Sequence, residues 1–153
     1  MPQIKVQTTI RAPLQTVFDA ARDVELHTKT TAHTREEVVG GRREGLFELG
    51  DEVTFEATHF FVRQRLSARI VEMNAPKSFS DEMLRGAFQK LRHEHRFEVA
   101  ESGTRMIDVL TWASPLGALG KVADALFLKR YMKQFLQRRN RELKRLVEEQ
   151  NQL

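Results

Sequence analysis

Thiol chemistry is the first thing that the sequence lacks, because none of its 153 residues is a cysteine. This absence excludes a disulfide framework, a cysteine nucleophile and a zinc finger. No stretch approaches the roughly 20 consecutive apolar residues that cross a bilayer. The N-terminal segment MPQIKVQTTIRAP also lacks the basic start and apolar run of a secretion signal. We therefore expect a soluble protein of the cytoplasm.

Motifs for covalent catalysis and for nucleotide binding are missing as well. The five serines of the sequence stand in no elbow or triad pattern of a nucleophile: Ser67, Ser78, Ser80, Ser102 and Ser114. The GALG segment lacks the following Lys-Ser or Lys-Thr and the glycine spacing of a phosphate-binding loop. We therefore expect neither a serine nucleophile nor a cofactor.

The length of the chain limits the number of domains, and the distribution of its charge indicates which classes of partner are compatible with it. A chain of this size buries most of its apolar surface in one core, so we expect a single domain spanning residues 1–153. The formal charge of +4 is uneven, since residues 121–145 hold nine Lys or Arg against Asp124 and Glu142. Such a segment is compatible with nucleic acid or an anionic membrane as a partner. We favour a solvated helix face and expect no nucleic-acid partner, because charge runs alone specify little.

The hydrophobic pattern predicts an antiparallel α+β fold. QIKVQTTI alternates like a first strand, and Pro13 then suits the first turn of a helix that continues to Val24. A second short helix is expected near residues 24–30. Residues 33–112 are strand-like, with turn signals that divide them into six strands. A long helix over residues 116–149 closes the chain, and runs of strands followed by a helix are typical of α+β domains.

The long C-terminal helix has two different halves. An apolar stripe follows it through Leu128, Met132, Phe135, Leu143 and Leu146, and Arg139 falls inside this stripe. The first half is apolar nearly all round, because Leu119, Leu126 and Phe127 lie on another side. A helix of this kind is covered by the sheet, by a ligand or by another subunit, so a homodimer through its first half is possible.

Two histidines interrupt the apolar face of one predicted strand. In KLRHEHRFEVA, residues 90–100, His93 and His95 share a side with Leu91, Phe97 and Val99. Side chains on a strand alternate sides with period two, so both imidazoles point toward the expected core. Two titratable groups on such a face require partners inside the protein or on a ligand.

Four segments resemble the START and Bet v 1-like (SRPBCC) superfamily, and together they extend over nearly the whole chain. They are IRAPLQTVFDAARD, GDEVTFEATHFF, FSDEMLRGAFQKLRHEHRFE and TRMIDVLTWASPLGALG. The last two segments carry the motifs FxDEMxxGxF, HxHxF and MxDxxxxxxPLG, which are similar to a small stand-alone bacterial branch. That branch is itself similar to a domain joined to sugar-nucleotide epimerase-like proteins. The resemblance implies a helix-grip fold. In it, a curved seven-stranded antiparallel sheet wraps around the long helix, two short helices follow the first strand, and a cavity takes apolar molecules.

The strand alternation then gives a predicted cavity wall. Its expected ligand-binding residues are Phe55, His59, Phe79, Met83, His93, His95, Asp108, Leu110 and Trp112 from the sheet, with Met132 and Arg139 from the helix. The same apolar side chains would also suit a sheet packed tightly on a helix, so the pattern alone does not distinguish a cavity from a filled core.

The polar members of this wall allow three interpretations. The first is a structural network in which His93 or His95 bonds Asp81 or Asp108 and Arg139 bonds a carboxylate. The second is a metal site that adds His59 or Asp108 to the histidine pair. The third is acid–base catalysis, with His93, His95 and Asp108 as candidates. We favour the first, expect no metal, and expect one histidine to bond an aspartate while the other faces a ligand.

The function that these features favour is binding or carriage of a small hydrophobic or amphipathic molecule, such as a lipid, a polyketide or another aromatic or isoprenoid-like compound. A polyketide cyclase- or dehydratase-like enzyme that uses a cavity histidine is the second hypothesis, because fold alone does not separate binding from catalysis. An interaction module that works through the basic C-terminal helix is the third.

Overall fold

Seven antiparallel strands form one sheet in the order β1-β7-β6-β5-β4-β3-β2. The computed structural model describes residues 1–151, so the last two residues of the predicted 1–153 domain lie outside the described part. The elements are β1 (Gln3–Ile10), α1 (Leu14–Ala21), α2 (Val24–Thr30), a 3-10 turn (Ala32–Thr34), β2 (Glu37–Gly41), β3 (Glu52–His59), β4 (Val62–Asn74), β5 (Ser78–Arg85), β6 (Lys90–Ala100), β7 (Gly103–Ala113), α3 (Gly117–Ala123), a π-helical segment (Asp124–Leu128) and α4 (Lys129–Asn151). The six strands predicted between residues 33 and 112 are confirmed.

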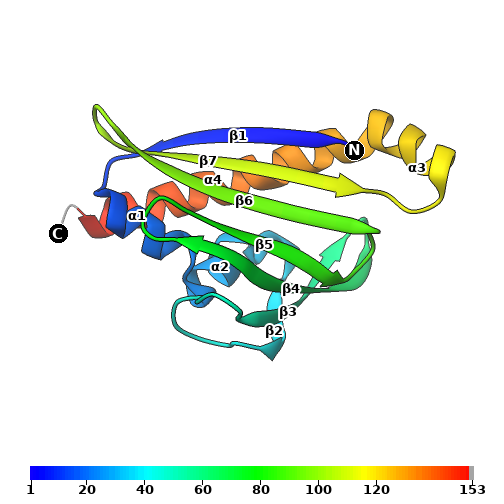
Figure 1. Ribbon diagram of the computed structural model, residues 1–153, viewed down its shortest axis with the longest axis horizontal. Coiled ribbons are helices and arrows are strands. Elements are labelled where there is room, and N and C mark those ends of the chain that lie inside the picture. The colour runs from blue at the N-terminus through cyan, green and yellow to red at the C-terminus, as the bar shows by residue number, and fades with distance from the viewer. Residues whose placement is uncertain (152–153) are drawn as a thin grey trace.

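The sheet curves around the long C-terminal helix, which Figure 1 shows behind β1, β7 and β6. Helix α4 contacts β1, and α1 and α2 pack against α4 as well. Buried side chains of α1, the sheet and α4 meet in one cluster that includes Phe18, Phe97 and Val147. The predicted helix-grip architecture is therefore confirmed. Among residues 1–151, no helix is long and apolar enough to cross a membrane.

The two short helices begin where local chemistry favours a helix start. Pro13 precedes α1, whose Val17 and Phe18 are buried against the sheet. Asp23 caps α2, because its carboxylate accepts hydrogen bonds from the backbone N–H of Glu25 at 2.9 Å and of Leu26 at 3.1 Å. Both helices occur where the sequence predicts them, and they cover one end of the sheet.

The predicted single helix over residues 116–149 is divided into α3, a π-helical segment and α4. The indole N–H of Trp112 and the hydroxyl of Ser114 donate to Asp124 at 2.9 and 2.6 Å, which ties the start of the π segment to the end of β7. A Cβ at Gly120 would collide with the carbonyl oxygen of Pro115, so only glycine allows α3 to approach this closely. Asp124, the first residue of the π segment, is thus anchored to the end of β7.

The π segment also changes which side chains of the helix are buried. A π turn contains an extra residue, so it shifts the helical register relative to a continuous α-helix. The buried face of α4 consists of Leu136, Arg139, Asn140, Leu143 and Val147. Of the predicted stripe, Leu143 is buried, whereas Leu128, Met132, Phe135 and Leu146 are half-buried. The stripe did not include the buried Leu136 and Val147. It also missed Asn140, which no apolar pattern could indicate.

Candidate ligand-binding site

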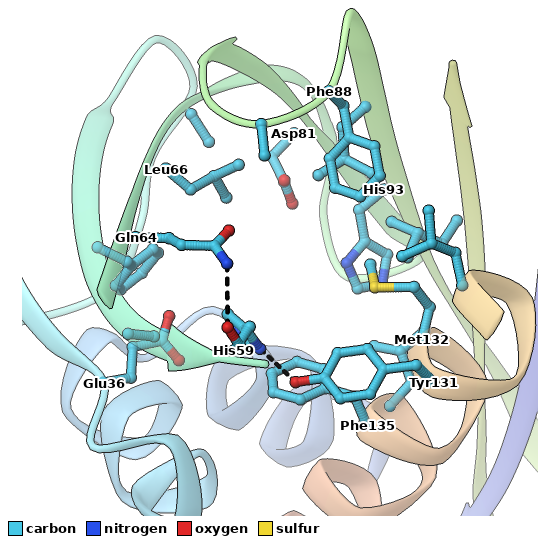
Figure 2. A pocket seen from close by; sticks show the side chains of 18 of the residues that line it. Glu36, His59, Gln64, Leu66, Asp81, Phe88, His93, Tyr131, Met132 and Phe135 are labelled. Carbon is cyan, nitrogen blue, oxygen red and sulfur yellow. Dashed lines mark hydrogen bonds between the residues drawn. The ribbon is translucent and has the colours of Figure 1, made fainter. Parts of the chain in front are cut away.

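A cavity of about 650 Å³ lies between the sheet and the C-terminal helices. Most of its wall is apolar, from Phe55, Ala57, Leu66, Ala68, Ile70, Phe79, Phe88, Leu91, Leu110, Leu128, Met132, Phe135 and Leu136. Figure 2 shows a few polar side chains on the same wall, including Glu36 and His59 on one side and His93 on the other. A mainly apolar cavity with a few placed polar groups is typical of a small-molecule site.

The mouth of the cavity is identified by lining residues that are also exposed. Phe60 lies in the turn between β3 and β4, and Leu116 and Leu119 belong to the start of the C-terminal helix. All three side chains are more than half exposed, whereas Leu110 and Phe79 deeper in the wall are buried. The cavity therefore opens at the end of the molecule where α3 lies in Figure 1.

The structure brings eight of the eleven predicted ligand-binding residues to the cavity wall. They are Phe55, His59, Phe79, His93, His95, Leu110, Met132 and Arg139.

Three predicted residues do not line the cavity. Asp108 is fully buried behind His93 and Arg139, and Trp112 is fully buried with its indole bonded to Asp124. Met83 packs toward Gly86, where an added Cβ would lie 2.7 Å from the Met83 sulfur. Strand alternation assigned these residues to the correct face, but it contains no information on depth within that face.

Both histidines of β6 are held by a carboxylate. The Nε2 atom of His93 lies 2.7 Å from Asp108 Oδ1, and the Nε2 atom of His95 lies 2.9 Å from Asp81 Oδ2. In the strand register Asp81 is opposite His93 and Asp108 is opposite His95. Each histidine thus bonds its diagonal cross-strand neighbour, which side chains of this length can reach. The expectation that only one histidine bonds an aspartate was therefore wrong.

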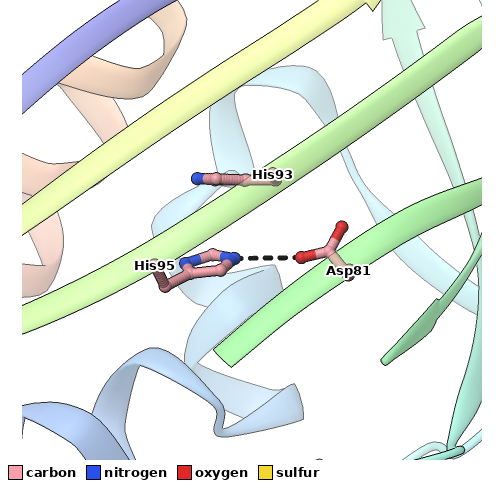
Figure 3. A group of neighbouring side chains, drawn as sticks. All are labelled: Asp81, His93 and His95. Carbon is pink, nitrogen blue, oxygen red and sulfur yellow. Dashed lines mark hydrogen bonds and ion pairs between the residues drawn. The ribbon is translucent and has the colours of Figure 1, made fainter. Parts of the chain in front are cut away.

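Aromatic stacking fixes the orientation of the two imidazoles. The rings of His93 and His95 stack with centroids 3.8 Å apart, and Phe79 stacks on the other face of His95 at 4.0 Å. Figure 3 shows the two imidazoles lying one above the other. His95 therefore lies between two rings and is tied at Nε2, so its ring has little freedom to turn toward a ligand.

A buried network surrounds Asp108 on the side of helix α4. Arg139 Nη2 donates to Asp108 Oδ1 at 3.1 Å, and Asn140 Nδ2 donates to Asp108 Oδ2 at 2.7 Å. Burial alone would raise the pKa of Asp108, but the hydrogen bond from His93 and the charge of Arg139 hold that pKa well below its usual range. Asp108 is thus an anion at neutral pH, and it accepts the Nε2 proton of His93.

Burial has the opposite consequence for His95. It lowers the pKa of His95 to about 4, and the nearby His93 acts in the same direction, against the opposing effect of Asp81. His95 is therefore neutral at pH 7 and donates from Nε2 to Asp81. Its Nδ1 atom is buried without a hydrogen-bond partner among the described residues.

Asp81, His93 and His95 place one possible ligand atom each within 4.8 Å of one another, which is the spacing that a metal site requires. The orientation of the rings opposes this use. An imidazole binds a metal through a lone pair in its ring plane, and the planes of His93 and His95 are only 23° apart in a face-to-face stack. Their lone pairs therefore do not converge on one ion. His59, which the metal interpretation included, bonds Tyr131 on another part of the wall.

A second polar group on the wall was missed in the sequence. Glu36 Oε1 lies 3.2 Å from His27 Nε2, while Glu36 Oε2 is buried without a partner among the described residues. Burial alone would raise the pKa of Glu36, but the charge of His27 and its hydrogen bond hold that pKa below its usual range. Glu36 comes just before β2, outside any alternating segment, so periodicity gave no signal for it.

The hydroxyl of Tyr131 and Nδ1 of His59 form a hydrogen bond of 2.5 Å on the same side of the cavity (Figure 2). Burial lowers the pKa of His59 and raises the pKa of Tyr131, so both side chains are neutral at pH 7. The hydrogen bond therefore joins two uncharged groups. Tyr131 directly precedes Met132 of the predicted helix stripe, and only its position beside this stripe could have indicated it.

Comparison with known proteins agrees with this geometry. The family model described as polyketide cyclase / dehydrase and lipid transport matches residues 1–148. No curated protein matches the sequence.

Solved structures share the fold at low sequence identity. TTHA0849 from Thermus thermophilus is 20% identical, with a TM-score of 0.78 over 95% of this chain and 97% of that one. Ara h 8.0201 is 16% identical, with a TM-score of 0.71 over 95% and 97% of the two chains. Ginseng major latex-like protein 151 from Panax ginseng is 12% identical, with a TM-score of 0.69 over 95% and 97%.

These structural likenesses establish the START and Bet v 1-like fold, and the match over residues 1–148 establishes the family. The chain belongs to the polyketide cyclase / dehydrase and lipid transport family, within the START and Bet v 1-like superfamily that its sequence motifs resemble.

Proposed function

We propose that the protein binds one small amphipathic molecule as a single ligand-binding domain, most simply as a carrier in the cytoplasm. The observation that carries this proposal is the cavity of about 650 Å³ with its apolar wall. Ligand pockets in proteins have volumes of roughly 300–1,000 Å³, so the cavity is large enough for a lipid-like chain or a fused ring system.

The unpartnered polar atoms of the wall suggest which polar group the ligand has. Glu36 Oε2 is a buried acceptor without a donor among the described residues, and an unpaired buried polar atom costs about 1–3 kcal/mol. A hydroxyl or amine on the ligand would remove this cost by donating to Glu36. The apolar part of the ligand would then extend along Phe55, Phe79, Leu110 and Met132, as the cavity wall permits.

Native mass spectrometry of protein purified without detergent tests this proposal. The expected result is a population heavier than the chain by the mass of one small molecule, which disappears under denaturing conditions. A Glu36→Gln variant is expected to lose or exchange ligands with a donor group, because an amide presents a donor beside the same position. Protein that is consistently empty and takes up no added aliphatic alcohol or amine would contradict the proposal.

Acid–base catalysis is the second candidate function, and one observation favours it. His93 donates from Nε2 to Asp108, while its Nδ1 forms no hydrogen bond with the described residues and its ring lies on the cavity wall (Figure 2). Such a ring can take a proton from a carbon next to a ligand carbonyl, which breaks the C–H bond, forms an N–H bond and leaves an enolate. Cyclisation and dehydration both begin with this step.

Proton exchange distinguishes catalysis from binding alone. We would follow the methyl protons of 2-acetonaphthone in D₂O by NMR in the presence of the protein. Catalysis predicts accelerated loss of this signal by the wild type, little loss with His93→Gln, and unchanged acceleration with His59→Gln. If the wild type binds the ketone without accelerating exchange, the carrier function stands alone.

A further inference from the structure

Large apolar side chains gather on the surface around the mouth of the cavity. They are Phe60 and Phe61 in the turn between β3 and β4, Val62 at the start of β4, Leu116 just before α3, Leu119 and Val122 in α3, and Leu126 and Phe127 in the π segment. Each of them is more than half exposed. Figure 1 shows α3 at one end of the molecule, with the hairpin between β6 and β7 at the other end. An exposed apolar patch of this kind marks an interaction surface.

The turn between β3 and β4 presents two phenylalanines at a strained position. His59 pairs with Val62, so Phe60 and Phe61 are the two central residues of a hairpin turn. Both have positive φ, 53° and 65°, a conformation that usually requires Gly or Asn. Phe60 packs on the ring of Tyr131, but Phe61 is fully exposed. The fold gains nothing from an aromatic ring at Phe61, which is consistent with a role in contacting another surface.

The helical half of the patch is held in place by buried contacts. Asp124 accepts hydrogen bonds from Trp112 and Ser114, which fixes the position of the π segment. Leu126 and Phe127 then point outward, while Leu128 lines the cavity. The apolar patch is thus presented by an anchored segment of the fold.

Unpaired positive charges flank this patch. Lys121, Lys129 and Arg130 are exposed, and within residues 1–151 the cations of the C-terminal helix that form ion pairs are Arg139, Lys144 and Arg145 and none of these three. Asp124 is the only carboxylate between residues 114 and 138, and it is buried and occupied by its two donors. The surface around the mouth therefore combines projecting apolar side chains with uncompensated positive charge.

We propose that this surface docks on an anionic lipid bilayer, with the cavity mouth facing the lipid. Aromatic and aliphatic side chains insert at the boundary between headgroups and acyl chains, while lysine and arginine pair with lipid phosphates. A second copy of this chain fits less well. A symmetric pair would bring Lys121, Lys129 and Arg130 near their own copies, with no exposed carboxylate in residues 114–138 to pair with them.

Docking does not require an occupied cavity, so this inference and the proposed function fail separately. A variant of Phe61 leaves the cavity wall intact, because Phe61 does not line it. Such a variant is expected to lose lipid docking and to keep ligand binding.

Vesicle co-sedimentation of the full chain tests the proposal. Vesicles of phosphatidylcholine alone are compared with vesicles that also contain phosphatidylglycerol, at low and at physiological salt. Phe61→Ser is expected to lower the partition coefficient on anionic vesicles about tenfold. Lys129→Gln is expected to lower it about fivefold. The matched controls are Val99→Ser, an exposed apolar residue at the opposite end, and Lys77→Gln in the turn beside Phe97.

The expected result is salt-sensitive binding to anionic vesicles that both patch variants weaken and neither control changes. Absence of binding at low salt, or an equal loss in the controls, would overturn the proposal. Light scattering of the free protein supplies the alternative outcome. A dimer that Phe61→Ser dissociates would show that a second copy covers the patch, and this too would overturn it.

Discussion

Asp108 is the common acceptor of a buried hydrogen-bond network that joins the sheet to helix α4. Its carboxylate accepts from His93, Arg139 and Asn140, and the side chain has no exposed surface. Arg139 is itself almost fully covered, so its charge has this carboxylate as its compensating partner. Removing one member of a buried ion pair costs far more than the net stabilisation of the pair, because the other charge is left uncompensated.

We therefore predict that Asp108→Asn lowers the free energy of unfolding by about 3–5 kcal/mol in denaturant titrations. Asp81→Asn serves as the control, with an expected loss of about 1 kcal/mol, because Asp81 is half-buried and water can replace its partner. The double variant Asp108→Asn with Arg139→Met is expected to recover part of the loss, since it removes both charges. Equal losses for the two aspartates would contradict this assignment.

His95 gives the protein a predicted sensitivity to acid. The unfolded chain takes up a proton at His95 below about pH 6.5, whereas the folded protein, with a pKa of about 4, does not. Its contribution to stability is therefore fully present above about pH 6.5 and is lost as the pH falls toward 4. The free energy of unfolding should fall by up to about 3 kcal/mol across this interval.

Urea titrations between pH 7 and pH 4 test this prediction, with His95→Gln as the comparison. The variant should show a shallower decrease, and not a flat line, because burial lowers the pKa of His59 as well. A wild type that becomes more stable as the pH falls would mean that His95 is charged between Asp81 and Asp108, contrary to the present assignment.

Strand alternation predicted which residues share a face of the sheet. This information was enough to assign His93, His95, Phe79 and Leu110 to the cavity wall. It could not predict the partners, because the hydrogen bonds run diagonally between strands and depend on the register. Asn140 and Glu36 were missed because a single polar residue in a helix or before a strand carries no periodic signal. Prediction from sequence is thus weakest for isolated polar residues.

At the scale of secondary-structure elements, the turn between β3 and β4 is where local conformation and sequence disagree. A turn with positive φ at both central residues favours Asn-Gly, and this chain has Phe60 and Phe61. A left-handed conformation costs roughly 1–2 kcal/mol for a residue with a Cβ. The turn is therefore less stable than it would be with favourable residues.

Phe61→Gly is predicted to raise the free energy of unfolding by about 1 kcal/mol, because it relieves this strain and removes no buried surface. Phe60→Gly relieves the same kind of strain but loses the contact with Tyr131, so its gain should be smaller or absent. Thermal or chemical unfolding of the two variants measures the difference. Destabilisation by Phe61→Gly would show that the ring at this position supports the fold.

The C-terminal helix shows how far the pattern of a single element can be interpreted. Its existence and its apolar first half follow from the sequence, but the π segment does not. The π segment begins at Asp124, which bonds Trp112 and Ser114 at the end of β7. A charged residue in a basic helix gives no indication in the sequence that it is buried.

At the scale of the whole molecule, the chain order and the resemblance to the START and Bet v 1-like superfamily predicted the architecture correctly. The strand count, the two short helices and the closing helix follow from alternation and turn signals. The cavity could not be derived in this way, because the apolar side chains that line it would also suit a filled core. Only the spacing between sheet and helix distinguishes the two, and that spacing is a property of the folded structure.

The central claim, that the cavity binds a small apolar or amphipathic molecule, is tested most directly by filling it. Ala57 of β3 lines the cavity, and Thr58 beside it points to the other face of the sheet. The measurement is a fluorescence titration with N-phenyl-1-naphthylamine of the wild type, Ala57→Phe and Thr58→Phe, with circular dichroism to confirm folding. We predict saturable binding of one probe to the wild type, about tenfold weaker binding to Ala57→Phe, and no change with Thr58→Phe. Equal affinity for all three proteins, or no saturable binding to the wild type, would contradict the account.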